Sequence, residues 1–250
     1  MAKKTFQALE SPFELKSRGR PLYPIFTAVP PSYDLINRIF TLRLDERWRK
    51  IATEEILAEN PARIMDLCTG TGDLAVRLAK MTEDKAEITG YDYSQPMLDL
   101  AHKKAARAGK GEIRFIKGDV AEMPFPENYF DSIGIAFAFR NLTFKNHDTE
   151  RFLKEIHRVL RPGGRFVIVE SSQPRYGWLK LLFRAWTRFF VYPVGSMVSG
   201  NRPAYKYLSY SVINYYGPEE ICELLKRFGF SEVNFRPLTG GISALHIAVK

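Results

Sequence analysis

The sequence predicts an α/β fold in which helices cover a mainly parallel sheet of seven strands. Segments typical of short strands and segments typical of helices alternate from residue 63 to residue 170. Such alternation indicates βαβ units. A glycine-rich turn follows the first strand, and a short turn joins the last two strands, which allows a terminal antiparallel hairpin. Together these features predict a Rossmann-like domain.

Each element is predicted from its own pattern of apolar and turn-forming residues. Strands are expected at 63–67, 86–91, 113–117, 129–137, 165–170, 232–236 and 243–249. Helices are expected at 73–81, 95–108, 148–160 and 218–228. Pro162 follows the third of these helices and cannot continue it. The order of the elements places the strand ends that could carry a site on one edge of the sheet.

The chain is expected to divide near residue 60. Residues 1–30 are rich in proline and basic residues, and a helical spacing of apolar residues follows until Pro61. Residues 1–60 are therefore interpreted as an N-terminal arm and a helical lid, and residues 61–250 as the main domain. A helical insertion is expected at 171–217, between the last βα unit and the final helix.

Charge is concentrated in two segments. The formal net charge is +9, and no acidic residue lies between Glu170 and Glu219. That acid-free segment contains six basic residues: Arg175, Lys180, Arg184, Arg188, Arg202 and Lys206. Residues 1–21 contribute a further +3. Segments of this kind indicate an anionic partner, which the charge alone leaves open between lipid headgroups, nucleic acid and a phosphorylated substrate.

Several classes of protein are excluded by composition. The two cysteines are too few for a disulfide framework or a zinc cluster, so no metal site is expected. No run of eighteen uncharged apolar residues is present, which excludes a membrane-spanning helix. No secretion signal follows the first methionine, and a cytoplasmic protein is expected.

A nucleotide-binding turn is the strongest local signal. Gly70-Thr71-Gly72 opens the first helix after a strand, and Gly70 to Ala75 fits the G-x-G-x-x-G/A pattern. The next strand ends at Asp92, where a carboxylate can accept hydrogen bonds from two ribose hydroxyls. This much suits NAD as well as S-adenosylmethionine.

Three features favour S-adenosylmethionine. Asp66 precedes the glycine turn, where its carboxylate can meet the ammonium or sulfonium side of the donor. Asp119 and Val120 end the third strand, where they place a polar group and a backbone N–H beside adenine. The terminal hairpin completes the strand order usual for methyltransferases. S-adenosylmethionine is therefore the expected cofactor.

The substrate side is expected at the end of the fourth strand. Arg140 and Asn141 follow a long apolar run there, and ligands in open α/β sheets bind beyond the carboxyl ends of the strands. An arginine stays protonated and cannot itself be a base. Arg140 can hold an anion or orient a water molecule, and the alternative is a salt bridge to a nearby acid.

The insertion begins with an unusual amphipathic pattern. Lys180, Arg184 and Arg188 recur every four residues, while the positions around them in 177–191 are almost all apolar. The pattern is typical of a helix that lies in a membrane interface or of an apolar lid. The alternative is a core helix packed on the sheet.

Four further motifs resemble those of the ubiquinone/menaquinone biosynthesis C-methyltransferases, from about residue 33 to residue 250. They are Tyr33-Asp34-Leu35-Ile36-Asn37, Phe139-Arg140-Asn141-Leu142-Thr143, Ala204-Tyr205-Lys206-Tyr207-Leu208 and the run from Leu238 to His246. The resemblance implies donor contacts at Thr71, Asp92, Asp119, Val120 and Ala136. Many relatives carry serine at Ala136, so only a backbone contact could survive there. The resemblance also implies catalytic roles for Arg140, Asn141 and Tyr33.

The reaction that this resemblance implies is methylation of a ring carbon on a polyprenylated quinol. Such a substrate stays in the membrane, so peripheral contact with an anionic surface on the inner face is expected. Another methyltransferase that acts on a phenolic or lipid-like small molecule is the main alternative. A basic protein that binds nucleic acid is a weaker alternative, and no nucleic-acid partner is expected. The motifs do not choose between a naphthoquinol and a benzoquinol, and they leave room for a homo-oligomer.

Overall fold

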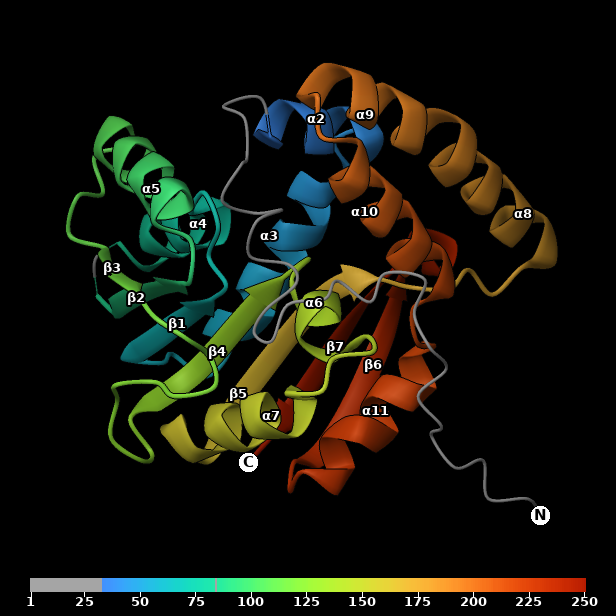
Figure 1. Ribbon diagram of the computed structural model, residues 1–250. Helices are drawn as coiled ribbons and strands as arrows, with labels where there is room; N and C mark the ends of the chain where they lie inside the picture. The colour runs from blue at the N-terminus through green and yellow to red at the C-terminus, as the bar shows by residue number, and fades with distance from the viewer. Residues whose placement is uncertain (1–32, 84) are drawn as a thin grey trace, which may run out of the picture.

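A single seven-stranded sheet organises the protein (Figure 1). The computed structural model describes residues 33–83 and 85–250, so the basic arm at residues 1–21 lies outside the described residues. The strands are β1 (Arg63–Leu67), β2 (Glu87–Asp92), β3 (Arg114–Lys117), β4 (Phe130–Ala136), β5 (Leu160–Ser171), β6 (Ser231–Leu238) and β7 (Ser243–Val249). Their order is β3-β2-β1-β4-β5-β7-β6. Only β7 pairs antiparallel, with β5 on one side and β6 on the other. The predicted fold class is confirmed.

Helices fill the connections between the strands. Those of the main βα units are α4 (Asp73–Thr82), α5 (Gln95–Arg107), α6 (Phe139–Thr143), α7 (Thr149–Val159) and α11 (Pro218–Arg227). Two more, α2 (Tyr33–Phe40) and α3 (Leu44–Leu57), precede the sheet. The insertion comprises α8 (Gly177–Trp186), a π-helical turn at Thr187–Val191, α9 (Tyr192–Ser199) and α10 (Arg202–Asn214). A short 3-10 turn at Thr239–Gly241 joins β6 to β7.

Most predicted boundaries lie within two residues of the observed ones, and β5 is the main exception. This strand was expected to begin at residue 165, but it begins at Leu160, which pairs with Phe130. The helix α7 does end before Pro162, as expected, yet the chain enters the strand directly. A register shift between the Phe130 and Ser132 pairs absorbs the extra residues. The short helix α6 was not predicted.

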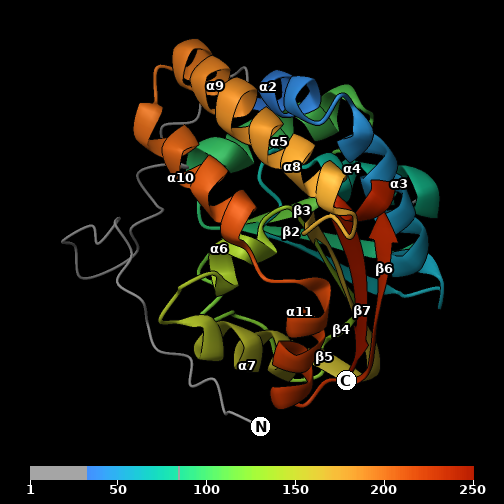
Figure 2. The same ribbon diagram turned by 90° about the vertical axis from the view of Figure 1, so that its right-hand side faces the viewer.

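Two apolar layers sandwich the sheet (Figures 1 and 2). One face packs against α3, α4 and α5, through side chains such as Ile56, Leu74 and Leu78. The other packs against α7 and α11, through Leu153, Ile156 and Ile221 among others. The helix α3 therefore belongs to the core of the main domain. Both layers hold the strands so that the carboxyl ends of β1, β2, β4 and β5 point to the same edge.

The insertion lies over that edge. Figures 1 and 2 show α8, α9 and α10 beyond the carboxyl ends of β4 and β5, and Figure 1 shows α9 next to α2 with α8 extending away from it. Gly195 of α9 packs directly on the ring of Tyr205 in α10, because a Cβ at position 195 would lie 2.2 Å from a ring carbon. None of the described helices is long and apolar enough to cross a membrane.

Gly195→Ala is expected to destabilise the fold. The added methyl group must push apart α9 and α10, and overpacking of this kind costs about 1–3 kcal/mol. Chemical denaturation of wild type and variant measures the free energy of unfolding. Gly177→Ala is the matched control, because a Cβ there meets nothing within 4 Å. Equal stability of the two variants would contradict the close packing at Gly195.

His246 is expected to make stability depend on pH. Burial lowers the pKa of this strand β7 side chain from 6.5 to about 4, although its hydrogen bond to the Pro218 carbonyl partly opposes the shift. Below pH 6.5 the unfolded chain binds a proton that the folded chain refuses, so stability falls as pH drops from 6.5 through 4. The loss approaches about 3 kcal/mol.

The measurement is the free energy of unfolding of wild type minus that of His246→Phe, followed between pH 8 and about pH 4. Phenylalanine does not titrate, so this difference should decline as the solution becomes more acidic. A difference that stays flat across the range would rule out a buried neutral His246.

Candidate functional site

A buried carboxylate fixes the glycine turn at the end of β1. Asp66 is 1% exposed. Its Oδ2 accepts hydrogen bonds from the Thr69 hydroxyl at 2.5 Å and from the Ala75 backbone N–H at 2.9 Å. Burial raises the pKa of Asp66 to about 7, against the lowering effect of these two donors. A cationic ligand group beside Asp66 would favour its ionised form.

The glycines of the turn meet two different demands. Gly70 and Gly72 both have positive φ, at 54° and 82°. A Cβ at Gly72 would also lie 3.0 Å from the Cβ of Ala101 in α5, so this glycine lets α4 and α5 approach. Cys68, just before, has a φ of 55° without being glycine. Burial raises the pKa of its thiol well above the ordinary value, so the side chain stays a neutral thiol that packs in the turn.

Asp92 at the end of β2 is joined to the same turn. Its Oδ2 accepts the Gly70 N–H at 2.8 Å, and its Oδ1 accepts the Ser94 N–H at 2.8 Å. Burial raises the pKa of Asp92, while the backbone N–H donors around it lower it. The structure therefore brings Asp66, Gly70, Gly72 and Asp92 together in one small region, as the sequence predicted.

The other residues predicted to contact S-adenosylmethionine lie around this region. Asp119 follows β3, where its backbone oxygen accepts the Tyr91 hydroxyl at 3.1 Å and its Oδ1 accepts the Ala121 N–H at 3.0 Å. Val120 beside it is buried. Ala136 ends β4 and pairs with Val169 of β5. Each lies at the carboxyl end of its strand, on the edge where the turn lies.

Thr71 is bonded to α2 in this structure. Its hydroxyl donates to Asp34 Oδ1 at 2.7 Å and accepts from Lys104 Nζ at 2.8 Å. Asp34 belongs to the first turn of α2, next to Tyr33. The side chain of Tyr33 lies outside the described part of the structure, so its predicted catalytic role stays a prediction.

Arg140 lies in a buried polar cluster with Glu170 and Ser211, which we call the Arg140 compartment. Its side chain is 4% exposed, and its Nε lies 3.8 Å from Oε1 of Glu170, whose side chain is fully buried. Its Nη1 donates to the Ser211 hydroxyl at 2.6 Å, and to Asn141 Oδ1 at 3.5 Å. Arg140 Nε is buried and has no hydrogen-bond partner among the described residues. The salt bridge that the sequence left open as an alternative is present.

Three residues of this compartment were missed from the sequence. Glu170 ends β5, and its Oε2 accepts the Arg140 backbone N–H at 3.0 Å. The carboxyl-end rule that singled out Arg140 could have found it. Ser211 and Tyr207 come from α10, and Ser211 accepts a hydrogen bond from Arg140. Burial raises the pKa of the Tyr207 phenol, although the charge of Arg140 opposes this. No local sequence signal places α10 there.

The strand pairing sets the relation between the two regions. In β1, Asp66 pairs with Gly134 of β4, and two residues further along β4 Ala136 pairs with Val169 of β5. Glu170 follows directly. The turn at Asp66 and the Arg140–Glu170 pair therefore occupy neighbouring strand ends. In the described residues, no group of three His, Cys, Asp or Glu side chains could hold a metal ion.

This arrangement has two chemical capabilities. The turn offers carboxylates and backbone groups to a polar, nucleotide-like ligand. The neighbouring compartment offers a desolvated cation, Arg140, that can stabilise a developing negative charge. Since Glu170 partly neutralises that cation, the compartment suits a neutral or singly ionised group.

Solved structures share this fold at low sequence identity. A SAM-dependent methyltransferase from Aquifex aeolicus is 20% identical, with a TM-score of 0.55 over 82% of this chain and 97% of its own. The [4+2]-cyclase SpnF is 19% identical, with a TM-score of 0.54 over 82% of this chain and 81% of its own. A cyclase among the neighbours shows that the fold alone does not decide the reaction.

Sequence relatives are much more similar. The demethylmenaquinone methyltransferase of Thermus thermophilus is 41% identical over 89% of this chain and 98% of its own length. The ubiquinone/menaquinone biosynthesis C-methyltransferase UbiE of Geotalea daltonii is 35% identical over 95% of this chain and 100% of its own. The model of the ubiE/COQ5 methyltransferase family matches residues 15–250. The chain therefore belongs to the ubiE/COQ5 methyltransferase family.

Proposed function

We propose that this protein transfers a methyl group from S-adenosylmethionine to a ring carbon of a polyprenylated quinol, with demethylmenaquinol as the preferred candidate. The observation that carries the proposal is the match of almost the whole chain to demethylmenaquinone methyltransferases, with 41% identity to that of Thermus thermophilus. The match includes the substrate side as well as the glycine turn. Methylation of a benzoquinol is the second candidate, because the Geotalea daltonii relative is named for both quinones.

The donor is proposed to lie over the glycine turn. Asp92 would accept hydrogen bonds from the ribose, and Asp66 would face the cationic end of the donor. Asp119, Val120 and Ala136 would surround the adenine and the sulfonium side, and Thr71 would close the turn. The support is geometric, because both carboxylates bind the same turn: Asp66 accepts the Thr69 hydroxyl, and Asp92 accepts the Gly70 N–H. A cation beside Asp66 would also lower its raised pKa.

The transfer step needs an activated ring carbon. A quinol that loses one hydroxyl proton pushes electron density onto the adjacent ring carbon. That carbon forms a bond to the donor methyl as the methyl–sulfur bond breaks, and sulfur leaves as the neutral thioether of S-adenosylhomocysteine. The methylated ring carbon then releases its own proton to a base or to water, which restores the aromatic ring.

Arg140 is proposed to stabilise the quinol anion. Its side chain is almost fully buried, and a desolvated cation interacts with a developing charge much more strongly than an exposed one. Asn141 would align the ring or a water molecule beside it. Tyr33 is proposed to take part in catalysis, as the family resemblance implies. The residues Ser211 and Tyr207 of α10 would then lie between the quinol and the bulk solvent.

Quinone analysis tests the substrate class directly. Cells that lack this protein should accumulate the demethylated quinone and lose its methylated product, as measured by mass spectrometry. The masses also distinguish a naphthoquinol from a benzoquinol. Unchanged quinones together with a changed profile of another phenolic or lipid-like compound would favour the alternative methyltransferase activity.

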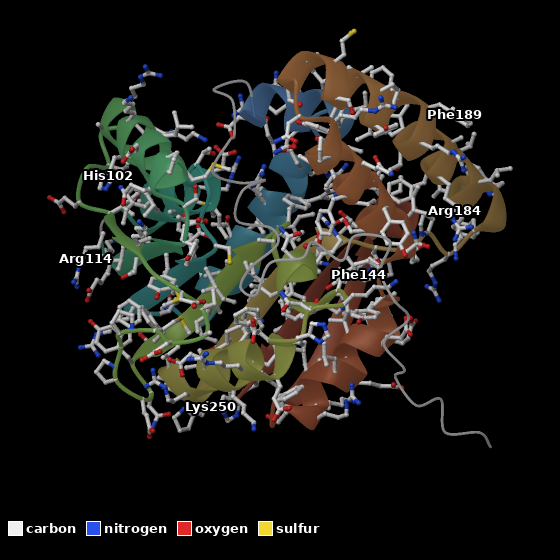
Figure 3. The ribbon with its side chains drawn as sticks, in the orientation of Figure 1. His102, Arg114, Phe144, Arg184, Phe189 and Lys250 are labelled. Atoms are coloured by element: carbon white, nitrogen blue, oxygen red, sulfur yellow. The ribbon has the colours of Figure 1, made fainter. Side chains whose placement is uncertain are left out.

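Peripheral contact with the membrane is proposed for the insertion. No residue of α8 is buried, so the alternative of a core helix is wrong. Its large apolar side chains include Trp178 at 64% exposure and Leu181 at 70%, and Phe189 in the following π-helical turn is 74% exposed. Figure 3 shows Arg184 and Phe189 on the outer side of the insertion. Exposed aromatic and basic side chains together suit a lipid interface on the inner face of a cytoplasmic membrane.

Substitution of Arg140 is expected to slow the reaction without weakening donor binding. Arg140→Lys keeps the charge near Glu170 but loses the planar guanidinium, and Arg140→Ala removes both. Turnover should fall by about 10²–10³-fold in the alanine variant, and less in the lysine variant. Calorimetry should give donor dissociation constants within about twofold of wild type, because the lost contact acts in the transition state.

The thermal midpoints of both variants show whether the fold survives the change at a buried ion pair. Arg158 on α7 pairs with Glu155, so Arg158→Ala controls for the loss of an ion pair elsewhere. If donor affinity fell in proportion to turnover, Arg140 would be a donor-site residue.

Membrane binding is expected to depend on the basic stripe of the insertion. Replacing Lys180, Arg184 and Arg188 by glutamine removes about 1 kcal/mol of attraction per residue, so partition onto anionic vesicles should fall about 100-fold. Salt should have the same effect on wild type. Co-sedimentation with vesicles measures the partition, and activity on a short-tailed, soluble quinol should be retained.

A variant with three exposed lysines elsewhere replaced by glutamine, at Lys80, Lys103 and Lys226, has the same net charge and should still bind vesicles. Equal loss in both triple variants would mean that total charge, and not the stripe, drives association. Tighter binding of wild type to nucleic acid than to anionic vesicles at matched salt would argue against a membrane partner.

A further inference from the structure

A lysine on α5 joins three separate segments. The Nζ of Lys104 donates to Asp34 Oδ2 at 2.7 Å and to Thr71 Oγ1 at 2.8 Å. It also donates to Asp73 Oδ1. An ammonium group has three N–H donors, so these partners use all of them. The three partners belong to α2, to the glycine turn and to the first residue of α4.

The contacts form a closed triangle around Thr71. The Thr71 hydroxyl donates to Asp34 Oδ1 at 2.7 Å, so Thr71, Asp34 and Lys104 are each bonded to the other two. Thr71 is 6% exposed, and the side chains of Lys104 and Asp34 are 27% and 24% exposed. Charge pairs at this depth are screened much less than surface pairs.

Asp34 depends on Lys104 for its counter-ion. Within residues 33–83 and 85–250, no other cation forms a salt bridge with Asp34. Asp73 differs, because Arg49 lies 3.9 Å from its carboxylate as well. Burial raises the pKa of Asp73, but the positive charges of Arg49 and Lys104 lower it by a larger amount, so the net shift is downward. Removal of the Lys104 charge would therefore leave Asp34 without a counter-ion among the described residues, whereas Asp73 would keep Arg49. The main effect would be on the attachment of α2.

The helix α2 needs such an anchor. It has eight residues, and a helix of this length is marginal in isolation and depends on tertiary contacts. Its other end is held by the insertion: Trp186 Nε1 donates to the Phe40 carbonyl at 3.0 Å. The Phe40 ring also packs edge-on against Phe190 and Tyr205. One end of α2 is therefore attached to the glycine turn, and the other end is attached to the insertion.

We propose that Lys104 is a positioning residue for the donor site, which holds α2 against the glycine turn through Asp34 and Thr71. This inference rests on the proposed placement of S-adenosylmethionine over that turn. Lys104 reaches the turn from α5, and acts through its partners. The contact keeps the turn and its helical cover in one arrangement before the donor arrives, and preorganisation of this kind increases affinity.

Lys104→Met tests the proposal, because methionine keeps much of the side-chain length and removes the charge. The dissociation constant for S-adenosylmethionine should rise about tenfold, the loss expected for one charge-assisted hydrogen bond. Amide exchange should accelerate in Tyr33–Phe40 and stay unchanged in β1 and β4. Lys103→Met is the matched control, since Lys103 is the exposed neighbour on the same helix, and it should change neither measurement.

A double variant shows whether Lys104 acts through Asp34. Asp34→Asn cuts the same contact from the other side and should also weaken donor binding. If the two residues act as a unit, Asp34→Asn combined with Lys104→Met should cost no more than the larger single change. Losses that multiply would overturn the proposed route. A lower thermal midpoint with unchanged donor affinity would reduce Lys104 to a structural role and overturn the proposal.

Asp92→Ala separates this proposal from the placement of the donor. If Asp92→Ala leaves the affinity for S-adenosylmethionine unchanged, the donor does not lie over the glycine turn and the placement fails first. If Asp92→Ala weakens binding strongly and Lys104→Met does not, the placement stands and only the role of Lys104 is overturned.

Discussion

The carboxylate of Asp66 is the constraint on which the site depends. It is buried at the end of β1, and it receives the Thr69 hydroxyl and the Ala75 N–H. These two bonds join the start of the turn to the first turn of α4, so the backbone between them has little freedom. Asp92 then binds the Gly70 N–H from the neighbouring strand. The polar edge of the sheet is therefore built around a turn that is already fixed.

The second buried charge pair has a different consequence. Arg140 lies in α6, which follows β4, and Glu170 lies in the adjacent strand β5. Both side chains are almost completely buried. A buried pair of this kind adds little to stability by itself, and the removal of one partner is costly. Its value lies in holding a cation at a defined place next to the turn. Strand pairing thus keeps the glycine turn and the Arg140–Glu170 pair adjacent but separate.

Much of the fold could be predicted from the sequence, because local patterns determine it. The bounds of β1 and β7 match the prediction, since both are short apolar runs between clear turn signals. The early start of β5 could not be predicted, because the pairing of Leu160 with Phe130 overrides the turn tendency of Pro162-Gly163-Gly164. The rule that ligands bind beyond the carboxyl ends of strands singled out Asp66, Asp92 and Arg140, and the structure places all three at that edge of the sheet.

The unpredicted parts of the site all come from tertiary packing. Ser211 reaches Arg140 across 71 residues, and Lys104 reaches Asp34 across 70. Nothing near either residue in the sequence indicates such a partner. The basic stripe of the insertion was visible as a pattern, but only the structure shows that the large apolar side chains around it are exposed. The structure therefore adds to the sequence analysis mainly the contacts between residues that are far apart in the chain. The types of the strands and helices were largely predicted.

The position of α10 over Arg140 has a consequence for kinetics. If the quinol ring meets Arg140, α10 must move aside to admit the ring and again to release the product. Each catalytic cycle then contains two conformational steps beside the chemical one, and such steps limit the rate in many enzymes with closing lids. The maximal rate would then be set by the movement of α10, and a faster methyl transfer alone would increase that rate very little.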